Sequence, residues 1–519
     1  MTGKTDGGMT GNLLAQLVSD GGIEADAGAA EQFETHLSHV LLAGDQAYKL
    51  KKPVKMPFVD FSTLEQRHAA CQAELEINRR MGSKLYRSVT PIVKRPDGRL
   101  QLDGEGETVD WVVIMKRFET AQRFDKLAEA GKIDDALARR TADRVADMHA
   151  GLSENRQAGH TADYRAIIRD LRRTEAEGAA ALGLSIGEPS PYDALDAELS
   201  HIDPLLEARR SHGKVRRTHG DLHLRNLCLY EGEVSPFDAL EFDDRLATTD
   251  VLYDLAFLLM DLRQSGLDRQ ANIIMNRYWD SAREEEEALA LLPFFMSLRA
   301  AIRMAVAVEA GNLDEAEAYR QLSHALLRQP KPVLVAIGGL SGTGKSTVAA
   351  SLAPKLPGPA GARFLRTDVL RKQTNGRPPE ESKADPCAYR MEKRVQTYKA
   401  LAAHAARAVH AGASVIADGT FQVSAAREAI LGVPGAHRHA IWLETPLATR
   451  LARVSGRTGD ASDADVEVAL SQNEPGDLDS RWRRVDASGS VEATTRNILQ
   501  EITDECDAAR ASRRPARSG

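Results

Sequence analysis

The feature that most constrains this chain is the run Gly339-Leu340-Ser341-Gly342-Thr343-Gly344-Lys345-Ser346, which directly follows the apolar residues 333–337. Glycines let the backbone wrap closely round phosphate groups, so that successive N–H groups point inward. Lys345 places a cation at the terminal phosphates, and the Ser346 hydroxyl is a candidate magnesium ligand. The pattern predicts a strand, a phosphate-binding loop that runs from Gly339 to Thr347, and a helix. An ordinary glycine turn before a helix is the alternative.

Beyond residue 332, short apolar runs alternate with helical patterns. The expected strands are 333–337, 364–366, 415–417 and 439–443. Each strand is followed by an expected helix, at 345–355, 389–411, 423–431 and 446–455 respectively. Alternation of this kind implies a parallel sheet covered by helices, an α/β fold. Pro330 and Pro332 interrupt the helical pattern that precedes this region, so we place a linker at residues 329–332.

Polar residues at the expected strand ends are candidates for chemistry. Asp418 follows the strand 415–417 and could hold magnesium through a water, or simply cap a helix. Asp368 follows the strand 364–366 and could accept the proton of an attacking hydroxyl, with a helix cap again the alternative. Three arginines further along could form a lid over the phosphates, or a solvated helix face. These are Arg450, Arg453 and Arg457.

The segments GGLSGTGKST, RTDVLRK and SVIADGTF, together with the arginine-bearing segment, resemble the small-molecule P-loop kinases. Gluconate kinase, shikimate kinase and zeta-toxin-like proteins belong to that group. The resemblance covers about residues 331–505. It implies that Asp368 contacts the acceptor and that the lid arginines bind ATP, and it does not identify the acceptor.

A second motif, His219-Gly220-Asp221-Leu222-His223-Leu224-Arg225-Asn226, lies in the N-terminal half. An Asp followed five residues later by an Asn suits phosphoryl transfer, because Asp221 would accept the hydroxyl proton and Asn226 would bind magnesium. Asp238 supplies a second acid, placed after a short turn. The two histidines and Asp221 could instead suggest zinc, although no paired histidine–glutamate helix motif is present in the sequence.

This motif resembles the signature of the aminoglycoside phosphotransferase family, a branch of the two-lobed protein-kinase-like fold, and the resemblance covers about residues 25–325. It implies that Asp221 is the catalytic base and that Asn226 and Asp238 are metal ligands. Glu241 is a rival for the second metal position, because the segment after Asp238 is longer than the usual family spacing. Asp254 resembles the acid that orders the catalytic loop, and His219 and His223 would shape that loop.

Kinases of this kind also need a lysine on a strand and a glutamate on the following helix. The turn Gly44-Asp45 separates two strand-like runs, and the second run carries Lys49, the expected phosphate contact, with Lys51 on the same face as the alternative. Glu74, on the expected helix 62–82, could pair with it; solvated charges are the alternative for both. Residues 115–118 would lie beside adenine. The sequence contains no glycine-rich GxGxxG loop to cover the phosphates.

In this order the two resemblances are similar to the bacterial bifunctional aminoglycoside phosphotransferase/ATP-binding proteins. The predicted organisation is a flexible N-terminus, a kinase-like domain, a linker, a P-loop kinase domain and a disordered basic tail, at residues 1–25, 26–328, 329–332, 333–507 and 508–519. We expect an ATP- and Mg²⁺-dependent phosphotransferase that acts on a hydroxyl of a small molecule. A pseudokinase that regulates the P-loop domain, or an ATPase switch without an acceptor, are the alternatives.

Composition narrows the setting. A net charge of -7 argues against a general nucleic-acid binder. The four cysteines are far apart with no CxxC spacing, and the N-terminus lacks the apolar core of a signal peptide, so we expect a cytoplasmic protein without a membrane anchor. The acidic run at residues 283–288 is typical of a solvated helix start rather than a binding site. Oligomeric state is left open.

Overall fold

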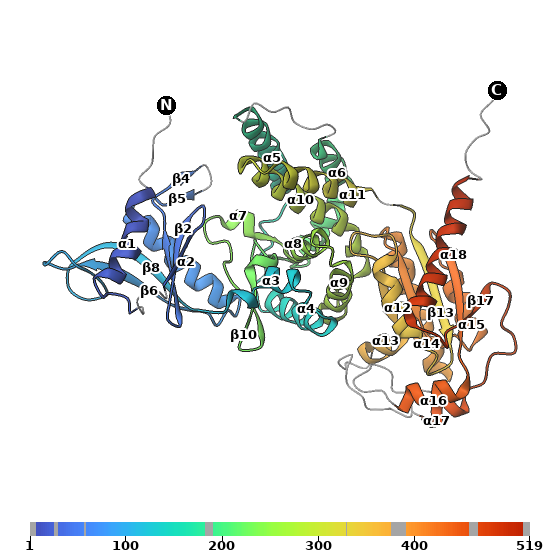
Figure 1. The fold of residues 1–519 in the computed structure, drawn as a ribbon. Helices are drawn as coiled ribbons and strands as arrows, with labels where there is room; N and C mark the ends of the chain where they lie inside the picture. The colour runs from blue at the N-terminus through green and yellow to red at the C-terminus, as the bar shows by residue number, and fades with distance from the viewer. Residues whose placement is uncertain are drawn as a thin grey trace. The chain divides into compact units, whose positions relative to one another are not determined.

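The structure is a computed structural model that describes residues 7–24, 30–56, 59–181, 190–328, 330–374, 391–455 and 466–511. The chain forms two compact units (Figure 1). Unit 1 comprises Met1–Ile167 and Asp203–Asp261, and unit 2 comprises Ile168–Ile202 and Leu262–Gly519. The division therefore passes through three helices, α5 (Thr161–Ala181), α6 (Pro191–Ser211) and α8 (Val251–Gln264).

Unit 1 begins with a six-stranded antiparallel sheet in the order β1-β2-β3-β8-β6-β7. Its strands are β1 (Glu31–Glu34), β2 (Ser38–Ala43), β3 (Gln46–Lys51), β6 (Tyr86–Lys94), β7 (Leu100–Leu102) and β8 (Glu107–Lys116). Side chains alternate between the two faces of β3 because the strand period is two. Tyr48 and Leu50 join the apolar cluster on one face, whereas Ala47 joins the cluster on the other. Lys49 and Lys51 share the face of Ala47.

A helix covers each face of this sheet. Helix α2 (Leu64–Arg80) begins with a capping box between Thr63 and Gln66 and packs on β6 and β8. Helix α1 (Gly7–Ser19) packs on the opposite face, where Leu14 and Leu17 are completely buried. The expectation of a flexible segment over residues 1–25 is therefore wrong for α1. Its glycine content concealed a short apolar stripe that the sheet needs to cover its second face.

The rest of unit 1 combines short strands with helices and carries the His219–Asn226 motif. The strands are paired as β4 (Lys55–Met56) with β5 (Val59–Asp60), β9 (Val215–Arg217) with β12 (Thr248–Asp250), and β10 (Leu227–Tyr230) with β11 (Glu233–Pro236). The helices are α3 (Phe124–Glu129), α4 (Asp135–Ala150) and α7 (Asp244–Ala247), with short 3-10 turns η1 (Thr120–Gln122) and η2 (Leu224–Asn226). The motif occupies the loop from β9 to η2.

Unit 2 contains a five-stranded parallel sheet in the order β14-β15-β13-β16-β17, as the alternating pattern predicts. Figure 1 labels β13 and β17 of this sheet. The strands are β13 (Val333–Gly339), β14 (Arg363–Arg366), β15 (Val415–Asp418), β16 (His437–Glu444) and β17 (Trp482–Asp486). The accompanying helices are α12 (Lys345–Leu352), η4 (Ala353–Lys355), α13 (Thr367–Thr374), α14 (Met391–His410), α15 (Ser424–Leu431), α16 (Leu447–Ser455), α17 (Val466–Ser471) and α18 (Val491–Ala511). Strand β17 was not predicted, because only its Trp482 and Val485 are buried among charged residues. Helix α18 enters the predicted tail, whose residues 512–519 lie outside the described residues.

The helical segments that precede the linker belong to unit 2, and the first of them packs on β14. They are α9 (Asp268–Ala282), η3 (Glu286–Leu291), α10 (Leu292–Glu309) and α11 (Leu313–Leu327). Strand β14 lies at the edge of the sheet, where an unpaired backbone would be open to other chains. Asn276 on α9 covers this edge: its Oδ1 accepts the Phe364 N–H at 2.7 Å, and its Nδ2 donates to the Ala362 carbonyl at 3.1 Å.

A buried charge cluster joins the same elements. Arg363 on β14 donates to Asp280 at 2.7 Å and to Glu286 at 3.0 Å, and His404 on α14 lies 3.2 Å from Glu286. Glu286 is only 1% exposed, so the prediction of a solvated helix start at residues 283–288 is wrong for this residue. The sequence could not show this, because the cation that neutralises Glu286 comes from a strand 77 residues away.

One stretch of unit 2, Glu286–Glu309, is long and apolar enough to cross a membrane. Within the structure 83% of its apolar window is buried, which is the behaviour of a core helix in a soluble protein.

Candidate active sites

The loop that carries the His219–Asn226 motif is held by one buried carboxylate. Asp254, on α8, accepts hydrogen bonds from the backbone N–H groups of His219 at 3.2 Å and Gly220 at 2.8 Å, and lies 3.1 Å from His149 Nε2. Gly220 has φ +81°, and a Cβ there would lie 2.9 Å from the Cβ of Ala247. The motif therefore needs glycine at this position, and Asp254 occupies the place that the family resemblance implies.

The polar side chains of the loop converge on Asp221. Asn226 Nδ2 donates to the Asp221 Oδ2 at 2.8 Å and to its backbone carbonyl at 2.9 Å, and His223 Nε2 lies 3.3 Å from the same Oδ2. Because the Asn226 amide donates through nitrogen here, its Oδ1 atom is the one available to a cation. His219, in contrast, is fully buried, and burial lowers the pKa of its imidazole. His219 supports the loop and is unsuited to contact a ligand.

A buried charge network lies in the same unit. Lys49 contacts both Glu74, at 2.8 Å, and Asp238, and Lys51 contacts both Glu74 and Glu241. Each lysine thus bridges Glu74 on α2 to one of the two acids that the sequence left as rivals. The predicted pairing of a strand lysine with Glu74 is present, and the structure adds Lys51 as a second partner.

The two rival acids have different surroundings. Burial raises the pKa of Glu241, and its side chain is only 6% exposed against Lys51. The Asp238 side chain is 42% exposed beside Lys49, on a residue with φ +60°. Burial opposes the Lys49 ammonium, but the carboxylates of Asp238 and Glu74 outweigh it and raise its pKa well above the ordinary value. Asp238 is therefore the acid that a bound cation can reach, whereas Glu241 is confined to an internal ion pair.

Two hydrogen bonds of the Phe237 backbone, one to a backbone group and one to a side chain, bring Asp238 to the catalytic loop. The Phe237 N–H donates to the Asn226 carbonyl at 3.0 Å, and the His219 ring lies 3.0 Å from the Phe237 carbonyl. Phe237 also packs against Phe118, with ring centroids 5.1 Å apart, at the end of the segment 115–118 that was expected beside adenine. The structure thus gathers Asp221, Asn226 and Asp238 in one region, with oxygen atoms of the kind that Mg²⁺ prefers.

In unit 2, the glycines of the 339–346 loop adopt the backbone conformations that the motif requires. Gly339, Gly342 and Gly344 have φ of +143°, +85° and +90°. A Cβ on Gly342 would lie 2.5 Å from the Arg450 carbonyl oxygen, and one on Gly339 would lie 2.7 Å from the Leu443 carbonyl oxygen. These are approaches to rigid backbone, so larger residues cannot replace the glycines without moving the loop.

The two predicted metal ligands of this loop meet directly. Ser346 Oγ donates to Asp418 Oδ2 at 2.5 Å, because β13 and β15 are neighbours in the parallel sheet and both end at this edge. Lys345 Nζ donates to the Leu340 carbonyl at 3.0 Å, across the loop that it would share with phosphates. A hydroxyl and a carboxylate side by side fit Mg²⁺, which takes oxygen ligands.

The predicted lid arginines have a different position from the one expected. Arg450 is buried and donates to the carbonyls of Ser341 at 2.9 Å and Ala469 at 2.8 Å. Arg453 donates to the Thr343 carbonyl at 3.3 Å and the Ala487 carbonyl at 3.0 Å. Both side chains therefore donate hydrogen bonds to backbone carbonyls of the phosphate-binding loop. Neither belongs to a solvated helix face. Arg457 lies outside the described residues.

A cavity of about 440 Å³ adjoins this loop and contains Asp368. Its lining residues are Thr367, Asp368, Arg371, Arg394, Thr397, Tyr398, Thr420, Gln422, Ser471 and Gln472. Gln472 Oε1 accepts the Ser341 N–H at 2.7 Å, so the cavity borders the phosphate-binding loop. Burial raises the pKa of Asp368 despite Arg371, whose guanidinium lies 3.2 Å away. A carboxylate with a raised pKa in a polar cavity suits proton abstraction from a hydroxyl.

Sequence reasoning missed most of this lining. Arg394 and Tyr398 lie on α14, and Gln472 follows α17, so no local motif connects them to Asp368. Among the described residues, no group of three or more histidine, cysteine, aspartate or glutamate side chains is placed to hold a metal ion.

Comparison with known proteins finds a family model that matches a segment in each half of the chain. Residues 63–289 match the phosphotransferase enzyme family, and residues 334–474 match an AAA domain family. The uncharacterized proteins Rv2004c of Mycobacterium tuberculosis and Mb2027c of Mycobacterium bovis are each 28% identical over 487 residues, which is 87% of this chain and 92% of the relative.

The solved structures that match parts of the chain include two kinases. The amicoumacin kinase hAmiN, in complex with AMP-PNP and Ca²⁺, is 13% identical, covers 62% of this chain and 93% of its own, and has a TM-score of 0.41. A gluconokinase from Sinorhizobium meliloti 1021 is 19% identical, covers 36% of this chain and 99% of its own, and has a TM-score of 0.26. Along the chain, a segment similar to the phosphotransferase enzyme family is therefore followed by a segment similar to an AAA domain family.

Proposed function

We propose that this protein is a phosphotransferase with two nucleotide sites, which moves the terminal phosphoryl group of ATP to a hydroxyl of a small molecule. The observation that carries the proposal is the neighbourhood of the phosphate-binding loop. There the Ser346–Asp418 pair and the Asp368 cavity adjoin the same loop. An ATPase switch would not need a polar cavity with a partly buried carboxylate beside its phosphates.

In the P-loop domain the residues divide into three roles. The backbone N–H groups of residues 339–346 and the Lys345 ammonium bind the phosphates and neutralise charge that develops during transfer. Ser346 and Asp418 would hold magnesium, which supplies further neutralisation when bound. Asp368 accepts the proton of the attacking hydroxyl, and its raised pKa improves it as a base near neutral pH.

The cavity lining favours a particular class of acceptor for this domain. Arg371 and Arg394 provide two guanidinium groups, and hydroxyl and amide side chains supply most of the remaining surface. Guanidinium groups select carboxylate or phosphate, and many hydroxyl-bearing side chains select a ligand rich in hydroxyls. We therefore expect a hydroxylated acid rather than a cationic antibiotic at this site.

In the kinase-like domain the arrangement supports transfer by Asp221, with Asn226 and Asp238 as ligands for magnesium and Lys49, paired with Glu74, on the phosphates. A regulatory pseudokinase remains the competing function, because the turn at Gly44 is too short to cover phosphates. Asp238 also contacts Lys49, so ATP and its metal would have to separate this pair on binding. We infer a soluble, cytoplasmic enzyme.

The test uses the full-length chain with one site disabled at a time. Hydroxyl-bearing acids and aminoglycosides are incubated with MgATP and screened for an 80-dalton mass gain, which is that of one phosphoryl group. Products made by the P-loop domain should vanish in Lys345→Ala and Asp368→Asn and persist in Asp221→Asn. Products made by the kinase-like domain should vanish in Asp221→Asn and persist in Lys345→Ala and Asp368→Asn.

Turnover of MgATP by the Lys345→Ala chain distinguishes an active kinase-like domain from a pseudokinase. If that turnover is absent while Asp221→Asn leaves every product unchanged, the kinase-like domain is a pseudokinase. If Lys345→Ala and Asp368→Asn both retain full activity on every product, the assignment of the P-loop domain is wrong.

A further inference from the structure

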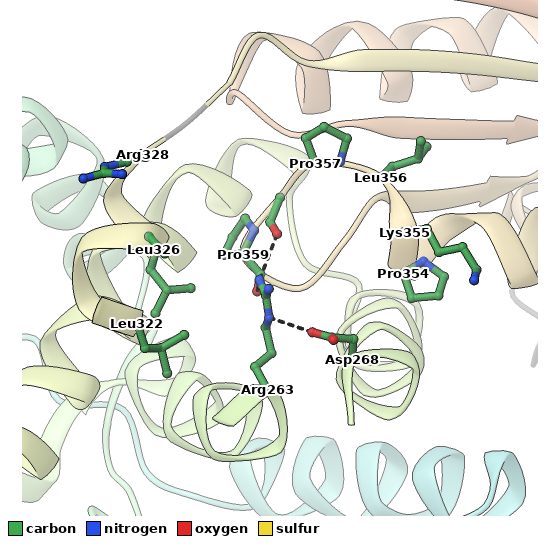
Figure 2. Close-up of a pocket in the computed structure, with 12 residues that line it drawn as sticks. Arg263, Asp268, Leu322, Leu326, Arg328, Pro354, Lys355, Leu356, Pro357 and Pro359 are labelled. Carbon is green, nitrogen blue, oxygen red and sulfur yellow. Dashed lines mark hydrogen bonds and ion pairs between the residues drawn. The ribbon is translucent and has the colours of Figure 1, made fainter. Parts of the chain in front are cut away.

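A second cavity of unit 2, about 370 Å³ in volume, shares no lining residue with the Asp368 cavity. One wall comes from α11 and its end, and the other from η4 and the loop that leads to β14 (Figure 2). Its lining residues are Arg263, Asp268, Leu322, Ala325, Leu326, Arg328, Pro354, Lys355, Leu356, Pro357, Gly358 and Pro359. A volume above about 300 Å³ is that of a small-molecule site.

The walls of this cavity are built before any ligand arrives. Prolines at positions 354, 357 and 359 restrict the loop to few backbone conformations. Arg263 reaches up to this loop and donates to the carbonyls of Pro359 at 2.6 Å and Gly358 at 3.2 Å, while Asp268 holds its Nε atom at 2.9 Å (Figure 2). Loop and helix are thereby tied together on either side of the cavity.

The charge of the lining is unbalanced. Three cations, Arg263, Arg328 and Lys355, face one acid, Asp268, and that acid is already paired with Arg263. Within the described parts of the chain, no carboxylate lies within 4.0 Å of the Arg328 or Lys355 side-chain nitrogens. Figure 2 places these two cations on opposite sides of the cavity. The positive charge is therefore available to a ligand from both walls.

The remaining lining is apolar, and this restricts the ligand further. Leu322 and Leu326 contribute the α11 side, and Pro354 and Pro357 contribute the loop side (Figure 2). An inorganic anion would leave these apolar side chains exposed to water, whereas the apolar part of an organic ligand would bury them. We propose that this cavity binds a small organic anion, with its phosphate or carboxylate group on the Arg328 or the Lys355 cation and its apolar body between the leucines and prolines.

The position gives such a ligand a direct contact with the P-loop domain. Lys355 ends η4, which continues α12, the helix that begins at Lys345 of the phosphate-binding loop. The cavity therefore lies at the far end of the helix that follows that loop, separate from Asp368 and its cavity.

The test measures binding of three probes to the full-length chain by isothermal titration calorimetry. The probes are phenyl phosphate, phenylacetate and inorganic phosphate, and all titrations use the Lys345→Ala background to weaken binding at the phosphate-binding loop. The double variant Arg328→Glu/Lys355→Glu reverses two exposed cations, so the fold should persist, which circular dichroism checks. Lys331→Glu, an exposed cation outside the lining, is the matched control.

We expect the Kd for the organic probes to rise at least tenfold in the double variant and to stay unchanged in Lys331→Glu. The ratio of the phenyl phosphate and phenylacetate affinities then identifies the preferred acidic group. Equal binding of inorganic phosphate and phenyl phosphate would overturn the role of the apolar walls. An unchanged Kd in the double variant, an equal loss in the control, or no binding of either organic probe would overturn the site itself.

Discussion

Replacing Arg363 by methionine should destabilise unit 2 far more than the loss of an ordinary arginine. The guanidinium neutralises Asp280 and Glu286 and also donates to Asn276 Oδ1 at 3.1 Å. Removing one partner of a buried ion pair costs about 3–5 kcal/mol, because the charge left behind has lost its solvation. His404 reduces the cost at Glu286 but does not reach Asp280 through any contact in the described residues.

Calorimetry of thermal unfolding measures this effect. With about 2–4 °C per kcal/mol for a unit of this size, the expected fall in Tm is roughly 6–20 °C. The matched control is Arg484→Met on β17, whose side chain is 48% exposed and pairs with Glu444 and Glu474. Exposed pairs contribute up to about 1 kcal/mol, so this control should shift Tm by no more than a few degrees.

The pH dependence gives an independent check. Burial alone would raise the pKa of Glu286, but Arg363 and His404 outweigh it, and the pKa lies below the ordinary value. Its stabilising effect is therefore present above the unfolded pKa of about 4.3 and is lost as pH falls through the folded pKa. In Arg363→Met the cation is gone, so burial raises the carboxyl pKa and protonation relieves the penalty. The Tm difference between wild type and variant should narrow from pH 8 to pH 5. The reasoning would be refuted if Arg363→Met lowered Tm by less than about 2 °C, or if the Tm difference between wild type and variant did not change with pH.

Four further outcomes are expected. Gly342→Ala should abolish nucleotide binding at the P-loop, measured by calorimetry, because the added Cβ would lie 2.5 Å from a backbone carbonyl oxygen. Gly412→Ala is the control, since Gly412 has nearly the same φ of +84° but no atom within 4 Å of the added Cβ. The control should only lower stability, by about 1 kcal/mol. Lys51→Met should lower stability by about 3–5 kcal/mol in denaturant unfolding, since it leaves two buried carboxylates short of a cation, and equal stability would contradict the network. Lys49→Met should chiefly weaken ATP affinity. Asp221→Asn, in the Lys345→Ala background, should lower single-turnover phosphoryl transfer by about 10²–10⁴-fold with little change in ATP affinity, and a fully active variant would exclude Asp221 as the base.

The charge cluster around Arg363 also changes how the two halves should be separated in experiments. A cut at residues 329–332 would remove Asp280, Glu286 and the Asn276 side chain that covers the edge of β14. A fragment of residues 330–519 would expose an unpaired strand edge beside an uncompensated cation. For this reason the variants above are designed in the full-length chain.

The motifs that the sequence determined by itself are local. The phosphate-binding loop requires glycines at fixed positions, and β13 before it and α12 after it follow from apolar runs and helical spacing within a dozen residues. The His219–Asn226 loop is equally compact, since Asn226 bonds to Asp221 only five residues away. Strand alternation was enough to predict the parallel sheet, although β17 escaped because an edge strand needs few apolar residues.

Tertiary structure alone decided which distant charges meet. It placed Asp238 beside Lys49 and confined Glu241 to Lys51, and it turned Arg450 toward the loop backbone. It also gathered the cavity around Asp368 from elements up to about a hundred residues apart and buried Glu286 against β14. The physical reason is that a sequence does not show the partner of a charged side chain, so such a side chain is expected to be solvated. Only packing shows whether a buried partner, a backbone carbonyl or water satisfies it.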